Sequence, residues 1–92
     1  MKGSYIGKAP GSKLFRVSLE WEGQTVKSIT IKGDFFAHPE QGFEEAEASL
    51  AGQALPGLGA MFKKELEDRS VELFGLSPLD LDVALAAILS GV

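Results

Sequence analysis

The chain has 92 residues, the size of one domain, and we expect residues 1–92 to form a single domain. It contains no cysteine and one histidine, which excludes disulfides, cysteine nucleophiles and thiolate metal sites and argues against a multi-histidine metal site. The net charge of −4 argues against nucleic acid as the main partner, and without a signal peptide or a membrane span we expect a soluble cytoplasmic protein.

The charge is divided unevenly along the chain. Residues 1–33 hold six basic and two acidic side chains, a net charge of +4, whereas residues 34–92 hold three basic and eleven acidic ones, a net charge of −8. The two halves either attract each other within the fold, or the basic half faces an anionic ligand or an acidic partner surface.

Two consecutive segments in the first half have the pattern of β-strands. Apolar and polar side chains alternate over residues 13–22, and residues 25–32 are rich in β-branched side chains. Gly23 between them can adopt the positive φ of a tight hairpin turn. We predict an antiparallel hairpin of 13–22 and 25–32 after a loop at 9–12, and a short edge strand at 4–7 is left open.

After Gly33 the pattern changes to a helical period. We expect a first helix over Pro39–Ala51, because its apolar residues recur at helical spacing. In this prediction His38 is the N-cap, Pro39 takes the first helical position and Gly52 stops the helix.

Two more helices are expected, over residues 58–69 and 78–89. The last one begins with Ser77 and Asp80 in a capping box. Residues 71–76 between them are punctuated by glycine and predict an extended connector. The order ββααα indicates an α+β fold, in which three helices pack on one face of a two- or three-stranded antiparallel sheet.

The side chains that catalysis needs are missing from the sequence. His38 has no cysteine partner and no serine lies in a nucleophile motif, so we expect it to be a cap or a surface contact. Glu40, Glu44, Glu45 and Glu47 follow helical spacing, which is typical of a solvated helix face. Neither glycine-rich phosphate-binding motif is present. We therefore predict no catalytic and no metal-binding residues.

The segment Gly33-Asp34-Phe35-Phe36 is unusual for the end of a strand. Adjacent side chains of a strand point to opposite faces, so only one of the two phenylalanines can enter the core directly. The other either packs under the following helix or anchors a partner protein. The sequence leaves both possibilities open.

Several segments in a fixed order carry a family resemblance. They are Gly11-Ser12-Lys13-Leu14, Ile29 to Phe36 with its Gly-Asp-Phe-Phe end, Pro39-Glu40, Leu55 and Gly75-Leu76-Ser77-Pro78. In this order they resemble the C-terminal, or accessory, domain of lipoate–protein ligases. The resemblance covers about residues 5–89, and Ser12 departs from it because a second glycine is expected there.

The resemblance implies a non-catalytic subunit. In such ligases a large catalytic domain binds lipoate and ATP with Mg, forms lipoyl-adenylate and transfers lipoate to a lysine of an acceptor domain. The accessory domain is fused to it or is a separate chain, supports the adenylation step, and is similar to the SufE/NifU-like fold. No cofactor is expected on the accessory domain alone, and neither nucleic acid nor a membrane is expected as a partner.

We expect the catalytic subunit to be the direct partner and the lipoyl acceptor domain an indirect one. The alternative is a stand-alone protein-binding module unrelated to lipoate, which would use the same hairpin edge or the last helix. The residues expected at the partner interface are Lys13, Lys32, Gly33, Asp34, Phe35, Phe36 and His38.

Overall fold

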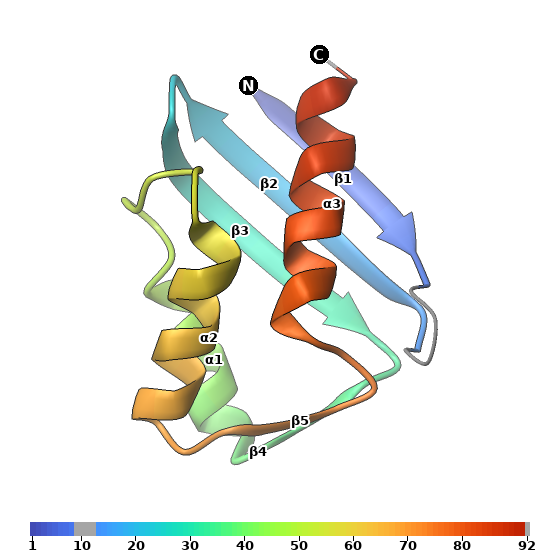
Figure 1. Ribbon diagram of the computed structural model, residues 1–92, viewed down its shortest axis with the longest axis vertical. Coiled ribbons are helices and arrows are strands. Elements are labelled where there is room, and N and C mark those ends of the chain that lie inside the picture. The colour runs from blue at the N-terminus through green and yellow to red at the C-terminus, as the bar shows by residue number, and fades with distance from the viewer. Residues whose placement is uncertain (9–12, 92) are drawn as a thin grey trace.

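A three-stranded antiparallel sheet forms one layer of the molecule in the computed structural model, which describes residues 1–8 and 13–91 (Figure 1). Its strands lie in the order β1 (Lys2–Gly7), β2 (Phe15–Glu22) and β3 (Thr25–Gly33). The predicted hairpin is confirmed as β2–β3, and Gly23 has a φ of +59° in its turn. The edge strand that the sequence left open is present as β1, whereas the predicted loop at 9–12 lies outside the described residues.

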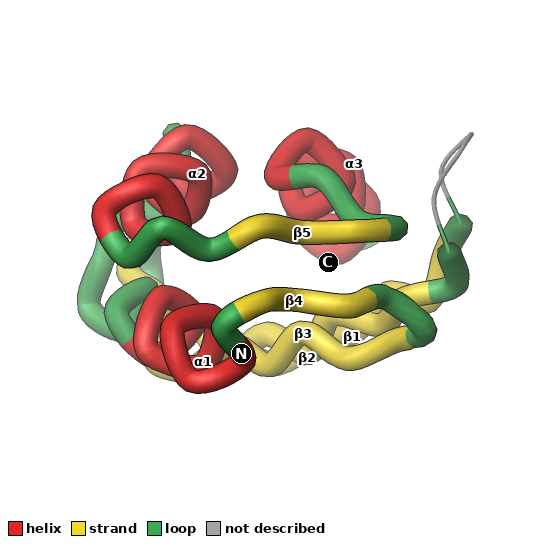
Figure 2. Tube along the Cα trace, turned by 90° about the horizontal axis from the view of Figure 1, so that it is seen from below, coloured by secondary structure: helices red, strands yellow, loops and turns green. Residues whose placement is uncertain are grey.

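The chain also forms three helices: α1 (Glu40–Ala48), α2 (Leu58–Asp68) and α3 (Pro78–Ser90). The second layer, α2 and α3, lies on one side of the sheet, whose other face is open in the described part of the chain, and α1 lies beside the β3 edge (Figure 2). The alternation along β2 explains this layering, because every second side chain of the strand is buried. The α+β fold is therefore confirmed. The core between the layers includes Phe15, Val17, Leu19, Trp21, Phe43, Leu58, Phe62, Leu81, Leu85 and Ile88.

The predicted start of the first helix is wrong. Pro39 is itself the N-cap, with extended φ and ψ of −73° and 142°, and a cis peptide bond joins it to His38. His38 is not a cap, because it belongs to a short strand, β4 (Phe36–His38). A proline has no side-chain acceptor for the first helical N–H groups, and no side chain among the described residues caps α1 by a hydrogen bond.

The first helix also ends earlier than predicted, at Ala48. The following turn bonds to the edge of β3 instead of continuing the helix. Gly52 donates its N–H to the Val26 carbonyl at 2.8 Å, and Val26 donates to the Gln53 carbonyl at 2.9 Å. These bonds cover part of an otherwise unpaired strand edge, which explains why the chain leaves the helix here. Gly52 has a φ of +86° in this turn.

The predicted connector at 71–76 contains a strand, β5 (Glu72–Phe74), which pairs with β4 as a second, two-stranded antiparallel sheet. The extended conformation is therefore confirmed, whereas the pairing with β4 was not predicted, because three-residue strands are too short to show an alternating pattern. The predicted capping box at the start of α3 is confirmed. Ser77 accepts a hydrogen bond from the Leu79 N–H at 3.2 Å, and Asp80 accepts one from the Ser77 N–H at 2.9 Å.

Candidate partner interface

Strands β4 and β5 form a short ribbon across one end of the molecule (Figure 2). Ala37 and Leu73 face each other in its register, and both pack against the core. Because side chains alternate along a strand, the residues on either side of this pair point outward. We call the four outward side chains the ribbon surface; they are Phe36, His38, Glu72 and Phe74.

An aromatic pair dominates the ribbon surface. Phe36 lies directly opposite Phe74, and their exposed fractions are 75% and 55%. His38 lies opposite Glu72 beside them, and both are exposed. Large aromatic side chains next to a few charged groups are typical of a protein-binding surface.

The ends of the ribbon are tied to the three-stranded sheet by backbone hydrogen bonds. Lys13 donates its N–H to the Gly75 carbonyl at 2.8 Å, and Asp34 donates to the Leu14 carbonyl at 2.9 Å. Gly75 has a φ of +87°, a backbone conformation that residues with a side chain rarely adopt. These contacts hold the ribbon surface next to the exposed end of β2 and β3.

The structure brings most of the predicted interface residues to this end of the molecule. Lys13 adjoins the ribbon through its hydrogen bond to Gly75, and Asp34 lies two residues before β4 in the chain. Phe36 and His38 are part of the ribbon surface. Lys32 and Gly33 end strand β3 and line a hollow together with Phe36.

Two of the predicted interface residues also have a structural role at this end of the molecule. Phe35 packs inward on Phe43, with ring centroids 5.4 Å apart, so it supports the ribbon from inside. Of the two adjacent phenylalanines, Phe35 is thus the one that turns toward the core and is partly buried, and Phe36 is exposed. Gly33 is required for close packing, because a Cβ there would collide with the Leu14 carbonyl oxygen.

Sequence reasoning missed Phe74 and Glu72, which form the other half of the ribbon surface. Only the long-range pairing of β5 with β4 places them beside Phe36 and His38. The local sequence gave no signal for this, because Phe74 is as apolar as Leu73 and three residues cannot establish an alternating pattern.

Glu47 of α1 has a structural role near this end. Its carboxylate accepts a hydrogen bond of 2.6 Å from the Ile31 N–H and so covers the β3 edge near the end of the strand. Burial raises the pKa of Glu47 above its ordinary value, an effect that the Ile31 bond and the charge of Lys32 partly offset. The nearby charge of Glu44 raises this pKa further.

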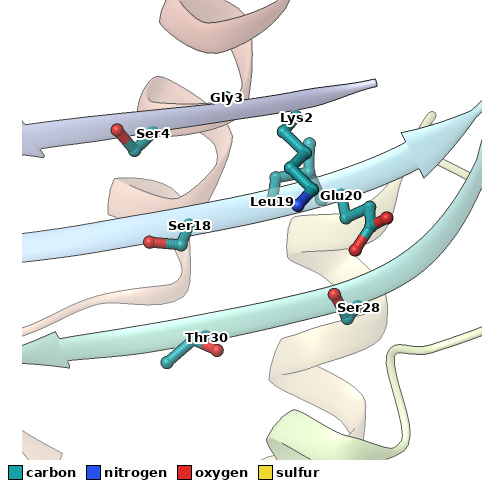
Figure 3. A pocket seen from close by; sticks show the side chains of 8 residues that line it. All are labelled: Lys2, Gly3, Ser4, Ser18, Leu19, Glu20, Ser28 and Thr30. Atoms are coloured by element: carbon teal, nitrogen blue, oxygen red, sulfur yellow. The ribbon is translucent and has the colours of Figure 1, made fainter.

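The open face of the sheet is polar. Ser4, Ser18 and Thr30 lie opposite one another on the three strands and form a row of hydroxyl groups (Figure 3). Lys2 and Glu20 face each other at one end of the same hollow, whose volume is about 390 Å³. A face on which polar side chains lie next to one another across the strands is typical of a sheet face that contacts solvent.

The described residues contain no group of three His, Asp or Glu side chains placed to hold a metal ion. Over residues 1–8 and 13–91, none of the helices has the length and apolar character to cross a membrane. The ribbon surface offers aromatic contact area, one imidazole and one carboxylate. It can bind another protein through shape and apolar burial.

No protein-family model matches the chain. Lipoate–protein ligase A subunit 2 from Thermoplasma acidophilum is 32% identical to it over 75 residues, which are 82% of this chain and 79% of that protein. A solved chain from the same organism's archaeal lipoylation system, described as a bipartite lipoate–protein ligase and its E2 lipoyl domain, has the same fold. It matches with a TM-score of 0.79 and 32% identity, over 92% of this chain and 94% of that one. Sequence and fold therefore agree over most of both chains, and this chain belongs to the lipoate–protein ligase A subunit 2 family.

Proposed function

We propose that this chain is the non-catalytic accessory subunit of a two-part lipoate–protein ligase and supports lipoyl-adenylate formation by a separate catalytic subunit. The observation that carries this proposal is the sequence match to lipoate–protein ligase A subunit 2 over 82% of the chain, together with the fold match to a chain of a bipartite ligase system over 92% of it. In this proposal the catalytic subunit binds lipoate, ATP and Mg in the cytoplasm. The lipoyl acceptor domain is then an indirect partner.

The ribbon surface supports a role in binding rather than in bond making. Adenylation is favoured when water is excluded from the reacting groups and the surrounding loops are held closed. A small rigid domain supplies this by covering the site, and it needs a complementary surface but no nucleophile of its own. The exposed Phe36–Phe74 pair provides such a surface.

The neighbouring residues have two roles in this proposal: some contact the catalytic subunit, and Phe35 holds the contacting strand in place. In the proposed interface, Phe36 and Phe74 are the aromatic anchors, and the exposed Lys13 and Lys32 lie at the rim. Phe35 acts from inside, by holding the strand from which Phe36 projects. His38 and Asp34 add polar contacts at the rim.

Lipoyl-adenylate formation by the matching catalytic subunit, assayed with and without this chain, tests the proposal. We expect adenylation to rise strongly when the wild-type chain is added, and to rise little when the Phe36→Ser variant is added instead. The matched control is Leu79→Ser, because Leu79 is 72% exposed but lies on α3. Equal adenylation with and without the wild-type chain would leave a protein-binding module unrelated to lipoate as the better account.

A further inference from the structure

Two aliphatic side chains interrupt the polar character of the open sheet face. Ile6 of β1 is 57% exposed, and Leu14, which continues the outward side of β2, is 50% exposed. Isolated exposed aliphatic residues are ordinary, but these two border the same hollow. The hollow has a volume of about 250 Å³, and the residues that line it include Ile6, Leu14, Arg16, Lys32 and Asp34.

Two cations lie opposite each other beside this hollow. Arg16 of β2 faces Lys32 of β3 in the antiparallel register, and Ile6 of β1 continues the same row. Like charges directly opposite each other destabilise a sheet. Among the described residues, neither cation forms an ion pair within 4.0 Å of a carboxylate, and Asp34 is the only acidic side chain that lines the hollow.

The charge of Lys32 also acts on Glu47 of α1, but Arg16 and Lys32 still face each other directly, and this arrangement fits an acidic partner. A carboxylate placed between Arg16 and Lys32 would relieve their repulsion. An apolar side chain beside it would cover Ile6 and Leu14. A partner that brings both groups would therefore match the hollow in charge and in hydrophobicity.

We propose that the hollow receives an apolar side chain of the catalytic subunit, with a carboxylate of the same partner between Arg16 and Lys32. This inference rests on the proposed function. A small molecule fits less well, because ligand pockets usually measure about 300–1,000 Å³ and enclose most of the ligand. Lys32 also lines the neighbouring hollow with Phe36, so one partner can cover this site and the ribbon surface together.

Arg16→Glu tests the inference without endangering the fold. The substitution replaces a like-charge pair by an opposite-charge pair with Lys32, so thermal stability should be equal or higher. Affinity for the catalytic subunit at low salt should nevertheless fall about tenfold or more. Lys63→Glu on α2 is the matched control, because it makes the same charge change on an exposed residue of the helical layer, and its affinity should stay within about twofold.

Leu14→Ser tests the apolar half, with an expected loss of about tenfold in affinity. Wild-type affinity should also fall as salt is raised, and Arg16→Glu should remove part of that dependence. If Arg16→Glu did not fold, Arg16→Gln would carry the same test with a loss of about threefold.

These experiments distinguish failure of this inference from failure of the proposed function. If Arg16→Glu and Leu14→Ser both bound the catalytic subunit and supported adenylation as well as the wild-type chain does, this inference would be overturned. The accessory role would remain intact. A wild-type chain that neither binds the catalytic subunit nor raises adenylation would overturn the accessory role itself.

Discussion

Phe36 and Phe74 lie directly opposite each other across the β4–β5 ribbon, although one precedes α1 and the other follows α2. Both rings are more than half exposed, at 75% and 55%. The next pair along the ribbon, Ala37 and Leu73, packs against the core on the inner side. The aromatic pair is therefore free to contact another molecule, whereas Ala37 and Leu73 stabilise the fold.

Replacing the aromatic pair should weaken partner binding without unfolding the domain. Phe36→Ser and Phe74→Ser are each expected to cost about 2 kcal/mol of binding free energy, about thirtyfold in Kd, as anchors of an interface do. The free energy of unfolding should change by less than about 0.5 kcal/mol, since both side chains are exposed. Titration against the catalytic subunit measures the first and urea denaturation the second. Wild-type binding by both variants would contradict the assignment.

The two adjacent phenylalanines should behave differently in stability. Phe35→Ala removes a ring that packs on Phe43 and is expected to destabilise the domain by about 2 kcal/mol, less than for a fully buried ring. Phe36→Ala should have almost no effect on unfolding. Thermal and urea unfolding of both variants checks this contrast. Equal destabilisation by the two substitutions would mean that Phe36 is also packed.

Gly75 should be intolerant of a side chain. Its φ of +87° is strained for alanine, and a Cβ there would lie 2.7 Å from the Lys13 Cγ. Gly75→Ala is expected to destabilise the domain by about 1–3 kcal/mol and to loosen the ribbon. Gly23→Ala is the informative comparison, because Gly23 also has a positive φ, but no atom of the part of the chain that the structure describes lies within 4 Å of the position of an added Cβ. A smaller cost at Gly23 than at Gly75 would separate the clash from the backbone strain.

Glu47 should make stability depend on pH. Its pKa is raised above the ordinary 4.5 in the folded chain, chiefly by burial, so the folded state holds the proton more tightly than the unfolded state. Its contribution therefore favours folding below pH 4.5 and is lost as the pH rises from there through the raised pKa. Glu47→Gln keeps an acceptor for the Ile31 N–H and removes the charge. Relative to wild type, this variant should gain stability as the pH rises through that window.

A second substitution separates the charge of Glu47 from its hydrogen bond. Glu47→Ala leaves the Ile31 N–H without its acceptor and should destabilise the domain by about 1–2 kcal/mol at neutral pH. Urea denaturation of the three proteins at several pH values checks both expectations. A stability difference between wild type and Glu47→Gln that did not vary with pH would refute the raised pKa.

The sequence predicted the parts of the fold that rest on local pattern. The β2–β3 hairpin follows from alternation and Gly23, and the start of α3 follows from the Ser77–Asp80 capping box. The first helix was misplaced at both ends because long-range pairing overrides local preference. Phe36–His38 pairs with β5, and Gly52 and Gln53 bond to the β3 edge. Likeness to the SufE/NifU-like fold stays a prediction.

The candidate interface was only half predictable. Two adjacent aromatics at a strand end indicated that one of them would be surplus to the core, and Phe36 is that residue. Phe74 and Glu72 had no such signal, since their importance arises only from pairing with residues far away in the chain. Leu14 was visible as an apolar residue on the polar side of its strand, but the hollow that it borders depends on the sheet register.

The most direct test of the accessory role separates the two half-reactions of the ligase. Lipoyl-adenylate formation from lipoate and ATP by the catalytic subunit should depend strongly on added chain, whereas transfer from preformed lipoyl-adenylate to the acceptor domain should change little. If adenylation is equally fast without the chain, and the two proteins do not co-elute, the accessory role is contradicted.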